Sequence, residues 1–456
     1  MAATGGSVFA AARSRRPNII IILADDMGYN GSSVYDGWIK TPNLERLAAE
    51  GMTFTDFHSS GVVCSPTRAG LMTGRYQERA GIPGVIYANP NNPAHYTGLQ
   101  PREITFAEQL DQVGYTCGLM GKWHLGYFKK YNPVHQGFNV FRGYVSGNVD
   151  YISHYDSTGV HDWWNGLEKV VEDGYSTHLI NRHSIEFINA NKDRPFCLYI
   201  AHEAVHSPFQ GPNSQIQRGP DAGKRKNADN LSQQEAYRQM MVEMDKSVGE
   251  VVAEVDRLGL SDNTLIFFFS DNGPAYIGGP DGYQFPLRGK KNTPWEGGHR
   301  VPAIARWPGK IKPGSRHDGL FISLDLMPTI LELAGAPAPK NRPLDGISIV
   351  NAMFKGADVG ERKLFWRGEA MRDGKWKFVT LPDGGLYDLS VDLAEQNDLS
   401  KQFPERAEEM KHAIEMWKKD VATGATQQSG LPPDIKVANP PKQTKQRRNR
   451  KQRKKK

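Results

Sequence analysis

Four short apolar runs that each stop abruptly at polar residues constrain the fold of this chain more than any other feature. They span residues 18–24, 116–120, 196–200 and 265–269. Continuous apolar runs of this length are typical of parallel strands that are buried on both faces. Helix-like segments separate them, and the clearest, from about Gln234 to Leu258, carries Met and Val residues along one stripe. We therefore predict an α/β fold with a large, mostly parallel sheet sandwiched by helices.

The sequence pattern changes after about Pro343. Short runs at 363–366, 375–379 and 385–389 are separated by Asp-Gly turns, which predicts a smaller C-terminal antiparallel sheet. A last helix is expected to pack on it, from roughly Glu405 to Val421. We divide the chain into an N-terminal stub at 1–16, a main domain at 17–345, a C-terminal α+β subdomain at 346–426 and a disordered basic tail at 427–456.

The net charge of +7 comes from the C-terminal tail. Residues 442–456 hold ten of the 57 Lys and Arg residues and no acid, which leaves 47 basic against 50 acidic residues in the body. The body therefore offers no basic face, and we expect no nucleic-acid partner. For the tail, a solvated charge block and a polyanion-docking segment both stay open.

The first twelve residues, MAATGGSVFAAA, end in small side chains as an export signal does at its cleavage site. They lack a positive start and a long apolar stretch. The pattern predicts a trimmed export signal and hence a periplasmic or secreted protein; a cytoplasmic protein with a frayed terminus is the alternative. No segment has the length and apolarity of a membrane span.

The chain has three cysteines, too few for a disulfide framework. Cys117 and Cys197 stand inside apolar runs and are expected to be buried. Cys64 begins the stretch Cys64-Ser-Pro-Thr-Arg68, which reads as a helix start with Pro66 at the first helical position. A helix N-terminus beside Arg68 suits a tetrahedral oxyanion. A buried cysteine with Arg68 in a salt bridge is the alternative.

Polar side chains follow each of the four apolar runs. Because the carboxyl ends of parallel strands meet at one edge of a sheet, we expect these side chains to lie close together. They are Asp25 and Asp26, Lys122 and His124, His202 and His206, and Asp271 and Asn272. The three carboxylates and the amide form an all-oxygen set, which suits a hard divalent cation such as calcium. Turns or helix caps are the alternative for each acidic pair.

Six sequence blocks, taken in order, resemble the type I sulfatase family. The central one is Cys64-Ser-Pro-Thr-Arg-Ala-Gly-Leu-Met-Thr-Gly-Arg75, which is similar to the family's modification signature. The others lie at 17–28, 121–126, 206–208, 270–273 and 289–298, and the stretch 386–397 resembles the family's ending. The resemblance spans about residues 17–420 and implies an alkaline-phosphatase-like fold. The pattern at 132–151 is similar to sulfatases of the arylsulfatase and N-acetylgalactosamine-sulfatase type.

The resemblance implies a sulfuric ester hydrolase acting on a sulfated carbohydrate or an aryl sulfate. It implies that a formylglycine-generating enzyme converts Cys64 to formylglycine, whose hydrate is the nucleophile. One calcium ion is expected on Asp25, Asp26, Asp271, Asn272 and the modified Cys64. Lys122, Lys291 and Arg68 would hold the charge of the sulfuryl group. His206 would be the acid for the leaving alcohol, a role that Lys291 could share, and His124 the base that releases sulfate. Lys291, rather than Lys290, takes the family position.

Several alternatives stay open at this stage. The same superfamily includes formylglycine-dependent phosphodiesterases and phosphonate monoester hydrolases, and a non-catalytic binding protein could keep the fold. Asp271 is both a predicted metal ligand and a candidate base for the nucleophilic hydroxyl. His202 could contact substrate or support the site, while Trp123 is expected to be packing. The aromatic stretch Trp163-Trp164, with Tyr151, Tyr155 and His161 nearby, could stack on a sugar ring or bury itself.

Overall fold

The computed structural model describes residues 16–220, 231–276, 278–280 and 285–429. Residues 1–15 and 430–456 fall outside this range. The predictions of an N-terminal stub and of a disordered basic tail therefore concern residues that lie almost entirely outside the described ones.

The four apolar runs form adjacent parallel strands, as predicted. They are β1 (Asn18–Ala24), β4 (Thr116–Lys122), β8 (Phe196–Ala201) and β9 (Thr264–Ser270). The order across this part of the sheet is β9-β1-β8-β4, and Ile20 of β1 pairs with Leu198 on one side and Ile266 on the other. All four strands thus end at the same edge of the sheet.

Six further strands complete a ten-stranded sheet of order β11-β2-β10-β9-β1-β8-β4-β5-β6-β7. They are β2 (Met52–Phe54), β5 (Val140–Tyr144), β6 (Trp164–Asn165), β7 (Glu168–Lys169), β10 (Ala303–Arg306) and β11 (Ser315–His317). β5 continues the parallel pairing, whereas β10, β6 and β7 run antiparallel to their inner neighbours. The sheet is therefore parallel at its centre and mixed toward its edges. β3 (Phe57–His58) and β12 (Phe321–Ile322) form a separate parallel pair.

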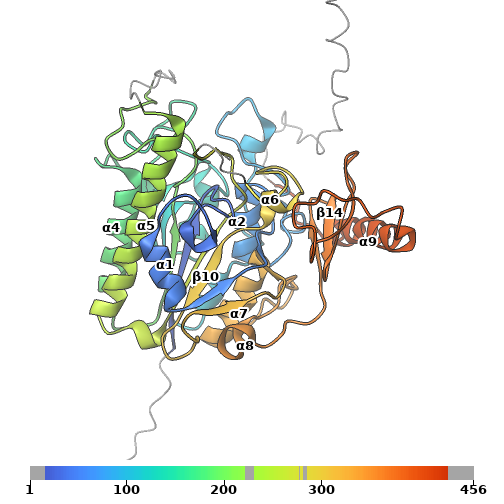
Figure 1. Cartoon of the computed structure of the whole chain (residues 1–456). Helices are drawn as coiled ribbons and strands as arrows, with labels where there is room; N and C mark the ends of the chain where they lie inside the picture. Colours follow the sequence, from blue (N-terminus) through green and yellow to red (C-terminus); the bar gives the residue numbers. More distant parts are fainter. Residues whose placement is uncertain (1–15, 221–230, 277, 281–284, 430–456) are drawn as a thin grey trace, which may run out of the picture.

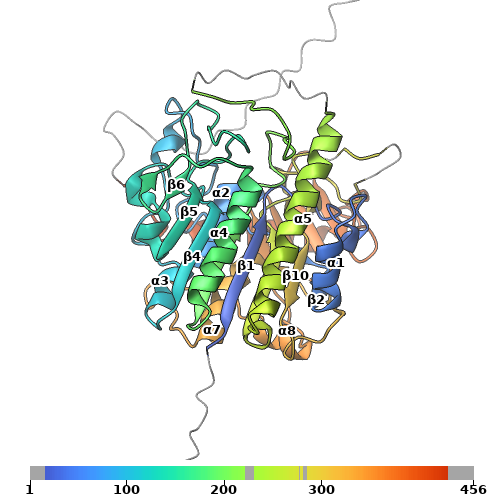
Figure 2. The same cartoon turned by 90° about the vertical axis from the view of Figure 1, so that its left-hand side faces the viewer.

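Helices cover both faces of the large sheet (Figures 1 and 2). One face carries α1 (Pro42–Ala49), α4 (Ser176–Asn191) and α5 (Gln233–Arg257); the other carries α2 (Cys64–Thr73), α3 (Phe106–Asp111), α7 (Leu326–Ala334) and α8 (Val350–Lys355). Alternation along β1 explains both layers. Ile20 belongs to the core with Met244 of α5, and Ile21 to the core with Met72 of α2. The predicted α/β sandwich is confirmed.

The C-terminal region forms a four-stranded antiparallel sheet with one helix, also as predicted. Its elements are β13 (Lys363–Trp366), β14 (Ala370–Asp373), β15 (Trp376–Val379), β16 (Gly385–Asp388) and α9 (Pro404–Ala422). The strand β14 was not predicted, because its sequence, Ala-Met-Arg-Asp, lacks an apolar run. Figure 1 shows this small sheet beside the α2 face of the main body, with α9 outermost. Its core includes Val62, two residues before Cys64.

Within the aromatic stretch, Trp163, Trp164 and Tyr151 are packing rather than an exposed platform for a sugar, whereas Tyr155 and His161 are half-buried. Trp163 is fully buried, stacks on His154 with ring centroids 4.5 Å apart, and donates its Nε1–H to Glu172. Trp164 and Tyr151 are buried too. Cys117 and Cys197 are buried as expected, and so is Trp123, whose Nε1–H donates to the Tyr131 carbonyl. Among the described helices, none has the length and apolarity to cross a membrane.

The β9 core gives a direct test of the fold. Phe268 is fully buried among the side chains that join the sheet to α5. We expect Phe268→Ala to lower the free energy of unfolding by about 3–5 kcal/mol, because it removes apolar contacts and leaves a cavity. Chemical denaturation followed by circular dichroism measures this change. The control Val391→Ala, at a site that is 84% exposed, should stay within about 0.5 kcal/mol of the wild type; equal effects of the two would contradict the packing described.

Candidate active site

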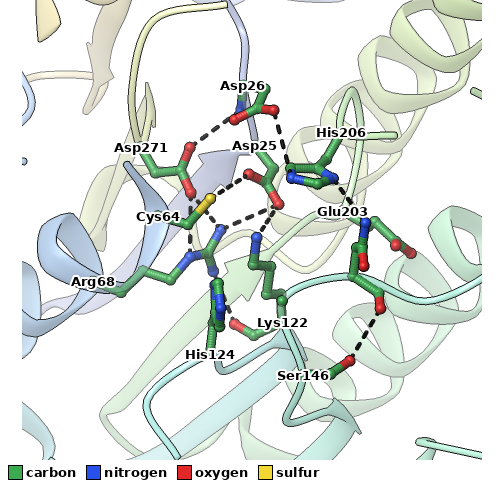
Figure 3. Close-up of polar contacts among 12 residues, drawn as sticks. Asp25, Asp26, Cys64, Arg68, Lys122, His124, Ser146, Glu203, His206 and Asp271 are labelled. Atoms are coloured by element: carbon green, nitrogen blue, oxygen red, sulfur yellow. Dashed lines mark hydrogen bonds and ion pairs between the residues drawn. The ribbon is translucent and has the colours of Figure 1, made fainter. Parts of the chain in front are cut away.

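The ends of β1 and β9 bring three carboxylates and one amide together. Asp25 and Asp26 follow β1, and Asp271 and Asn272 follow β9. The backbone locks them in place, since the Asp26 N–H donates to Asp271 Oδ1 at 3.1 Å and the Asp271 N–H donates to the Ala24 carbonyl at 3.1 Å. All four side chains are buried. Figure 3 shows Asp25 and Asp271 facing Cys64, Arg68 and Lys122, and Asp26 beside His206.

Cys64 is itself the first residue of α2, so Pro66 is the third helical residue and not the first, as the sequence suggested. The shift costs nothing in hydrogen bonding, because the N–H groups of the first turn have no partner inside the helix. The Cys64 side chain is 2% exposed. Its Sγ lies 3.4 Å from Asp25 Oδ1 and 3.4 Å from Lys291 Nζ.

Three cations pair with the three carboxylates. Lys122 Nζ lies 2.5 Å from Asp25 Oδ2, and Lys291 Nζ lies 2.6 Å from Asp26 Oδ1. Arg68 is completely buried and donates Nε–H and Nη2–H to Asp271 Oδ2, at 3.2 and 2.8 Å. A third Arg68 donor reaches the Lys122 carbonyl at 2.9 Å. Arg68 is therefore in a salt bridge, as one sequence interpretation held, and it also lies beside Cys64.

The surrounding charges perturb the Cys64 thiol. Burial alone would raise its pKa, but Lys122 and Lys291 outweigh burial and lower the pKa to about 6. Burial would also raise the pKa of Asp26, and here Lys291 and His206 hold it below its usual range. Position 64 is thus a place where the protein favours negative charge.

Two buried oxygen atoms of this cluster make no hydrogen bond within the described structure: Asp26 Oδ2 and Asn272 Oδ1. Atoms of Asp25, Asp26, Cys64 and His206 that could bind a metal ion lie within 4.8 Å of one another. His206 Nε2 lies 3.6 Å from Asp26 Oδ2, which is beyond hydrogen-bonding distance. Buried oxygens without a hydrogen bond are costly unless a cation or water satisfies them, so the residues fit a hard divalent cation. Asp271, also in the predicted ligand set, already has Oδ1 and Oδ2 engaged by a backbone N–H and by Arg68.

The two candidate catalytic histidines differ in their protonation. Burial, and then Lys122, lower the pKa of His124 well below its ordinary value, so His124 is neutral. Its Nε2 lies 2.8 Å from the Ile86 carbonyl, and its buried Nδ1 has no hydrogen-bond partner among the described residues. Burial and Lys291 would lower the pKa of His206, yet Asp26 and Asp25 outweigh them and raise it. The site therefore favours the neutral form of His124 and the charged form of His206.

Three residues near these histidines were not singled out from the sequence. Asn148 Nδ2 lies 3.3 Å from His206 Nδ1 and donates to the Ser207 carbonyl at 2.6 Å. Glu203 is buried, accepts from the Val149 N–H at 2.7 Å, and has its pKa raised to about 8 by burial. A Cβ at Gly147 would lie 2.8 Å from His124 Nε2. The signal for Glu203 was its place between His202 and His206.

The structure also distinguishes His202 and Lys290 from the residues that enter the site. His202 is 1% exposed and its Nε2 lies 3.1 Å from Ser247 Oγ, which indicates a supporting role. Lys290 points to the surface and Lys291 into the site, as the sequence predicted.

Comparison with known proteins decides the family. The sulfatase family model matches residues 17–336, most of the chain. The chain belongs to the sulfatase family. Rat (Rattus norvegicus) arylsulfatase G is 32% identical over 88% of this sulfatase and 86% of its own length. Dog (Canis lupus familiaris) N-acetylgalactosamine-6-sulfatase is 34% identical over 79% of this sulfatase and 70% of its own length.

A solved structure titled Ps i-CgsB superposes on this sulfatase with a TM-score of 0.80 and 29% identity, covering 91% of this chain and 95% of the other. A second structure of Ps i-CgsB is titled as a complex with k-i-k-neocarrahexaose. The family makes this protein an enzyme that hydrolyses sulfate esters, and the cluster at Asp25, Asp26 and Cys64 matches the family's general dependence on a metal.

Asp26 gives a test of the metal site that is independent of turnover. We expect Asp26→Asn to weaken calcium binding by at least about tenfold, since losing even an outer partner of a metal ligand typically costs that much. Titration calorimetry with calcium chloride measures the affinity. The exposed Asp262→Asn serves as control, and an unchanged affinity in Asp26→Asn would remove Asp26 from the ligand set.

Proposed function

We propose that the mature enzyme removes sulfate from a sulfated carbohydrate through a formylglycine at position 64, with one calcium ion bound. The observation that carries this proposal is the setting of Cys64. It opens a helix in the motif Cys64-Ser-Pro-Thr-Arg68, with Lys291 and Asp25 each 3.4 Å from its sulfur. A formylglycine-generating enzyme would be the partner that oxidises Cys64. For location, we propose export, on the sequence of residues 1–12 alone.

The calcium ion would be held by Asp25, Asp26, Asn272 and position 64. Asp271 is a weaker candidate ligand, because both of its oxygens already accept hydrogen bonds. When bound, such an ion polarises the sulfate oxygens and makes a neighbouring hydroxyl easier to deprotonate. Hydrated formylglycine supplies two hydroxyls, one as nucleophile toward sulfur and one through which sulfate is released by elimination.

The protein's own cations would stabilise the negative charge on the transferred group. Lys122 and Lys291 reach toward position 64 from opposite segments, β4 and the 288–299 loop, and are fixed by Asp25 and Asp26. Fixed positive charges in a buried site need no reorganisation as charge develops, so they lower the barrier. Arg68 adds its charge and, through Asp271, holds the end of β9 against α2.

His206 would protonate the leaving alcohol, and His124 would take the proton that accompanies sulfate release. Protonated His206 is favoured by Asp26 and Asp25, and the Ser207 carbonyl lies 2.6 Å from its Nδ1, which leaves Nε2 as the nitrogen that exchanges a proton. Neutral His124 has Nδ1 unpartnered, as a base requires. The opposite protonation of the two rings supports this division of roles.

A carbohydrate substrate is supported by the relatives, since one is named for N-acetylgalactosamine and a structural neighbour is titled with an oligosaccharide. Phosphodiester and phosphonate hydrolysis, the runner-up, is not favoured, because the family match and the curated relatives are sulfatases. A non-catalytic role is disfavoured because most of the predicted site residues lie together in Figure 3, and Lys291 and Asn272 each contact Asp26 of that cluster.

The first test is mass spectrometry of the peptide that contains Cys64, from protein co-expressed with a formylglycine-generating enzyme. We expect the aldehyde at position 64 and, with calcium, hydrolysis of an aryl sulfate far above that of the matching aryl phosphate. Cys64→Ala should abolish turnover, because no other residue replaces the nucleophile. Full activity of an unmodified preparation would contradict the mechanism.

A second test separates the acid from the rest of the site. His206→Gln should slow hydrolysis of a sugar sulfate by about 10²- to 10⁴-fold but 4-nitrophenyl sulfate far less, since nitrophenolate leaves without a proton. The pKa of His206 is raised by Asp26 and Asp25, so its acid form is lost at a higher pH than that of an ordinary histidine, as pH rises through that pKa. The wild-type rate on the sugar sulfate should therefore fall on the alkaline side, and His206→Gln should lack that fall. Equal losses on both substrates would exclude His206 as the acid.

A further inference from the structure

The loop that carries Lys291, residues 288–299, is hydrogen-bonded to the main domain at Lys291 and at the next residue. The Lys291 N–H donates to the Pro274 carbonyl at 3.0 Å, and the Asn292 N–H donates to the Val62 carbonyl at 2.8 Å. Asn292 has a φ of 69°, a left-handed conformation that a residue with a side chain adopts at a cost. The path of the loop at Lys291 therefore needs support from outside the loop.

That support comes from the small C-terminal sheet. Arg367, in the turn between β13 and β14, donates Nη1–H to the Asn292 carbonyl at 3.0 Å and to Asn292 Oδ1 at 3.1 Å. The side chain of Arg367 is 36% exposed, and its Nε lies 3.5 Å from Glu369. Arg367 is thus hydrogen-bonded to Asn292, the residue after Lys291, and is itself partly exposed.

A second contact lies deeper. Lys377 of β15 is completely buried, and its Nζ lies 2.9 Å from Glu296 Oε1, 2.9 Å from Glu395 Oε1 and 3.1 Å from His299 Nε2. Glu395 Oε2 accepts from the Glu296 N–H at 2.8 Å. Glu296 begins α6 (Glu296–His299), the end of the loop. One buried ammonium therefore joins the loop to β15 and to the segment that follows β16.

His58, Glu296 and His299 have the spacing of a metal site, with ligand atoms within 4.8 Å of one another. Lys377 already supplies the positive charge there, and Arg372 Nη1 adds a second cation 3.4 Å from Glu296 Oε2. His299 also stacks on Trp366 of β13, with ring centroids 3.9 Å apart. The cluster is therefore a cation-filled junction between the main domain and the small sheet.

We propose that the small C-terminal sheet positions Lys291 for catalysis, with Arg367 and Lys377 as positioning residues. The inference rests on the proposed role of Lys291 at the sulfuryl group. Lys291 has a long, flexible side chain, and its Nζ must stay 2.6 Å from Asp26 and 3.4 Å from Cys64. A displacement of about 1 Å can cost on the order of 100-fold in rate, so fixing the backbone at 291–292 matters to turnover.

Arg367 is the residue to change, because its exposure makes a folded variant attainable. In the matured, calcium-loaded enzyme, Arg367→Ala should lower kcat/KM for an aryl sulfate on the order of 10- to 100-fold. Arg367→Lys, which can still donate to the Asn292 carbonyl, should recover part of that loss. Lys363→Ala is the matched control: Lys363 is a cation of the same sheet that pairs with Asp373 and Glu409 instead of the loop, and its removal should leave kcat/KM unchanged.

A double-mutant cycle with Lys291→Ala makes the test specific. If Arg367 acts through Lys291, Arg367→Ala should have little further effect once Lys291 is gone. An equal loss in both backgrounds would overturn the inference while leaving the proposed function intact.

Hydrogen exchange followed by mass spectrometry gives a readout besides turnover. Peptides that cover 288–299 should exchange faster in Arg367→Ala and in Lys377→Met than in the wild type and in Lys363→Ala. Unchanged exchange in Arg367→Ala would overturn the inference. If Lys291→Ala keeps full turnover, the proposed role of Lys291 fails, and with it the claim that the sheet positions a catalytic residue.

Discussion

Three buried carboxylates at one edge of a parallel sheet require cationic partners, and the positions of several other segments depend on this requirement. Charges of one sign cannot be gathered away from water without partners of the opposite sign. Each acid pairs with one cation: Asp25 with Lys122 of β4, Asp26 with Lys291 of a distant loop, and Asp271 with Arg68 of α2. The sheet brings the acids together, and the pairing then dictates where three other segments must lie.

The same pairing explains why the site suits an anionic substrate. The three cations are each paired with a carboxylate, and two of them, Lys122 and Lys291, still favour a negative charge at position 64. A divalent cation among Asp25, Asp26 and Asn272 would make the site positive overall. Sulfate esters carry their charge on the oxygens that such a site can contact, so binding and stabilisation of developing charge come from the same groups.

The sequence was sufficient for the central strands and for the residues at their ends, because both leave local signals: a buried strand is a continuous apolar run, and its end is marked by Asp, Lys or His. Pairings over long sequence distances leave no such signal. Arg372 and Asp56, 316 residues apart, and Arg367 and Asn292 look like ordinary surface residues in the sequence. β14 was missed because its burial depends on its neighbours, and the interior place of Trp163 could not be told from an exposed aromatic patch.

The burial of Cys64 has a consequence for the time course of synthesis. Cys64 is 2% exposed and is closed to a second enzyme in the finished fold. Under the maturation that we propose, the modifying enzyme would therefore have to reach it earlier. Roughly 300 residues separate Cys64 from the first strand of the small sheet. At roughly 5–20 residues per second, the ribosome needs on the order of 15–60 s to make them. Cys64 is thus synthesised well before the small sheet, whose Arg367 contacts the loop beside it.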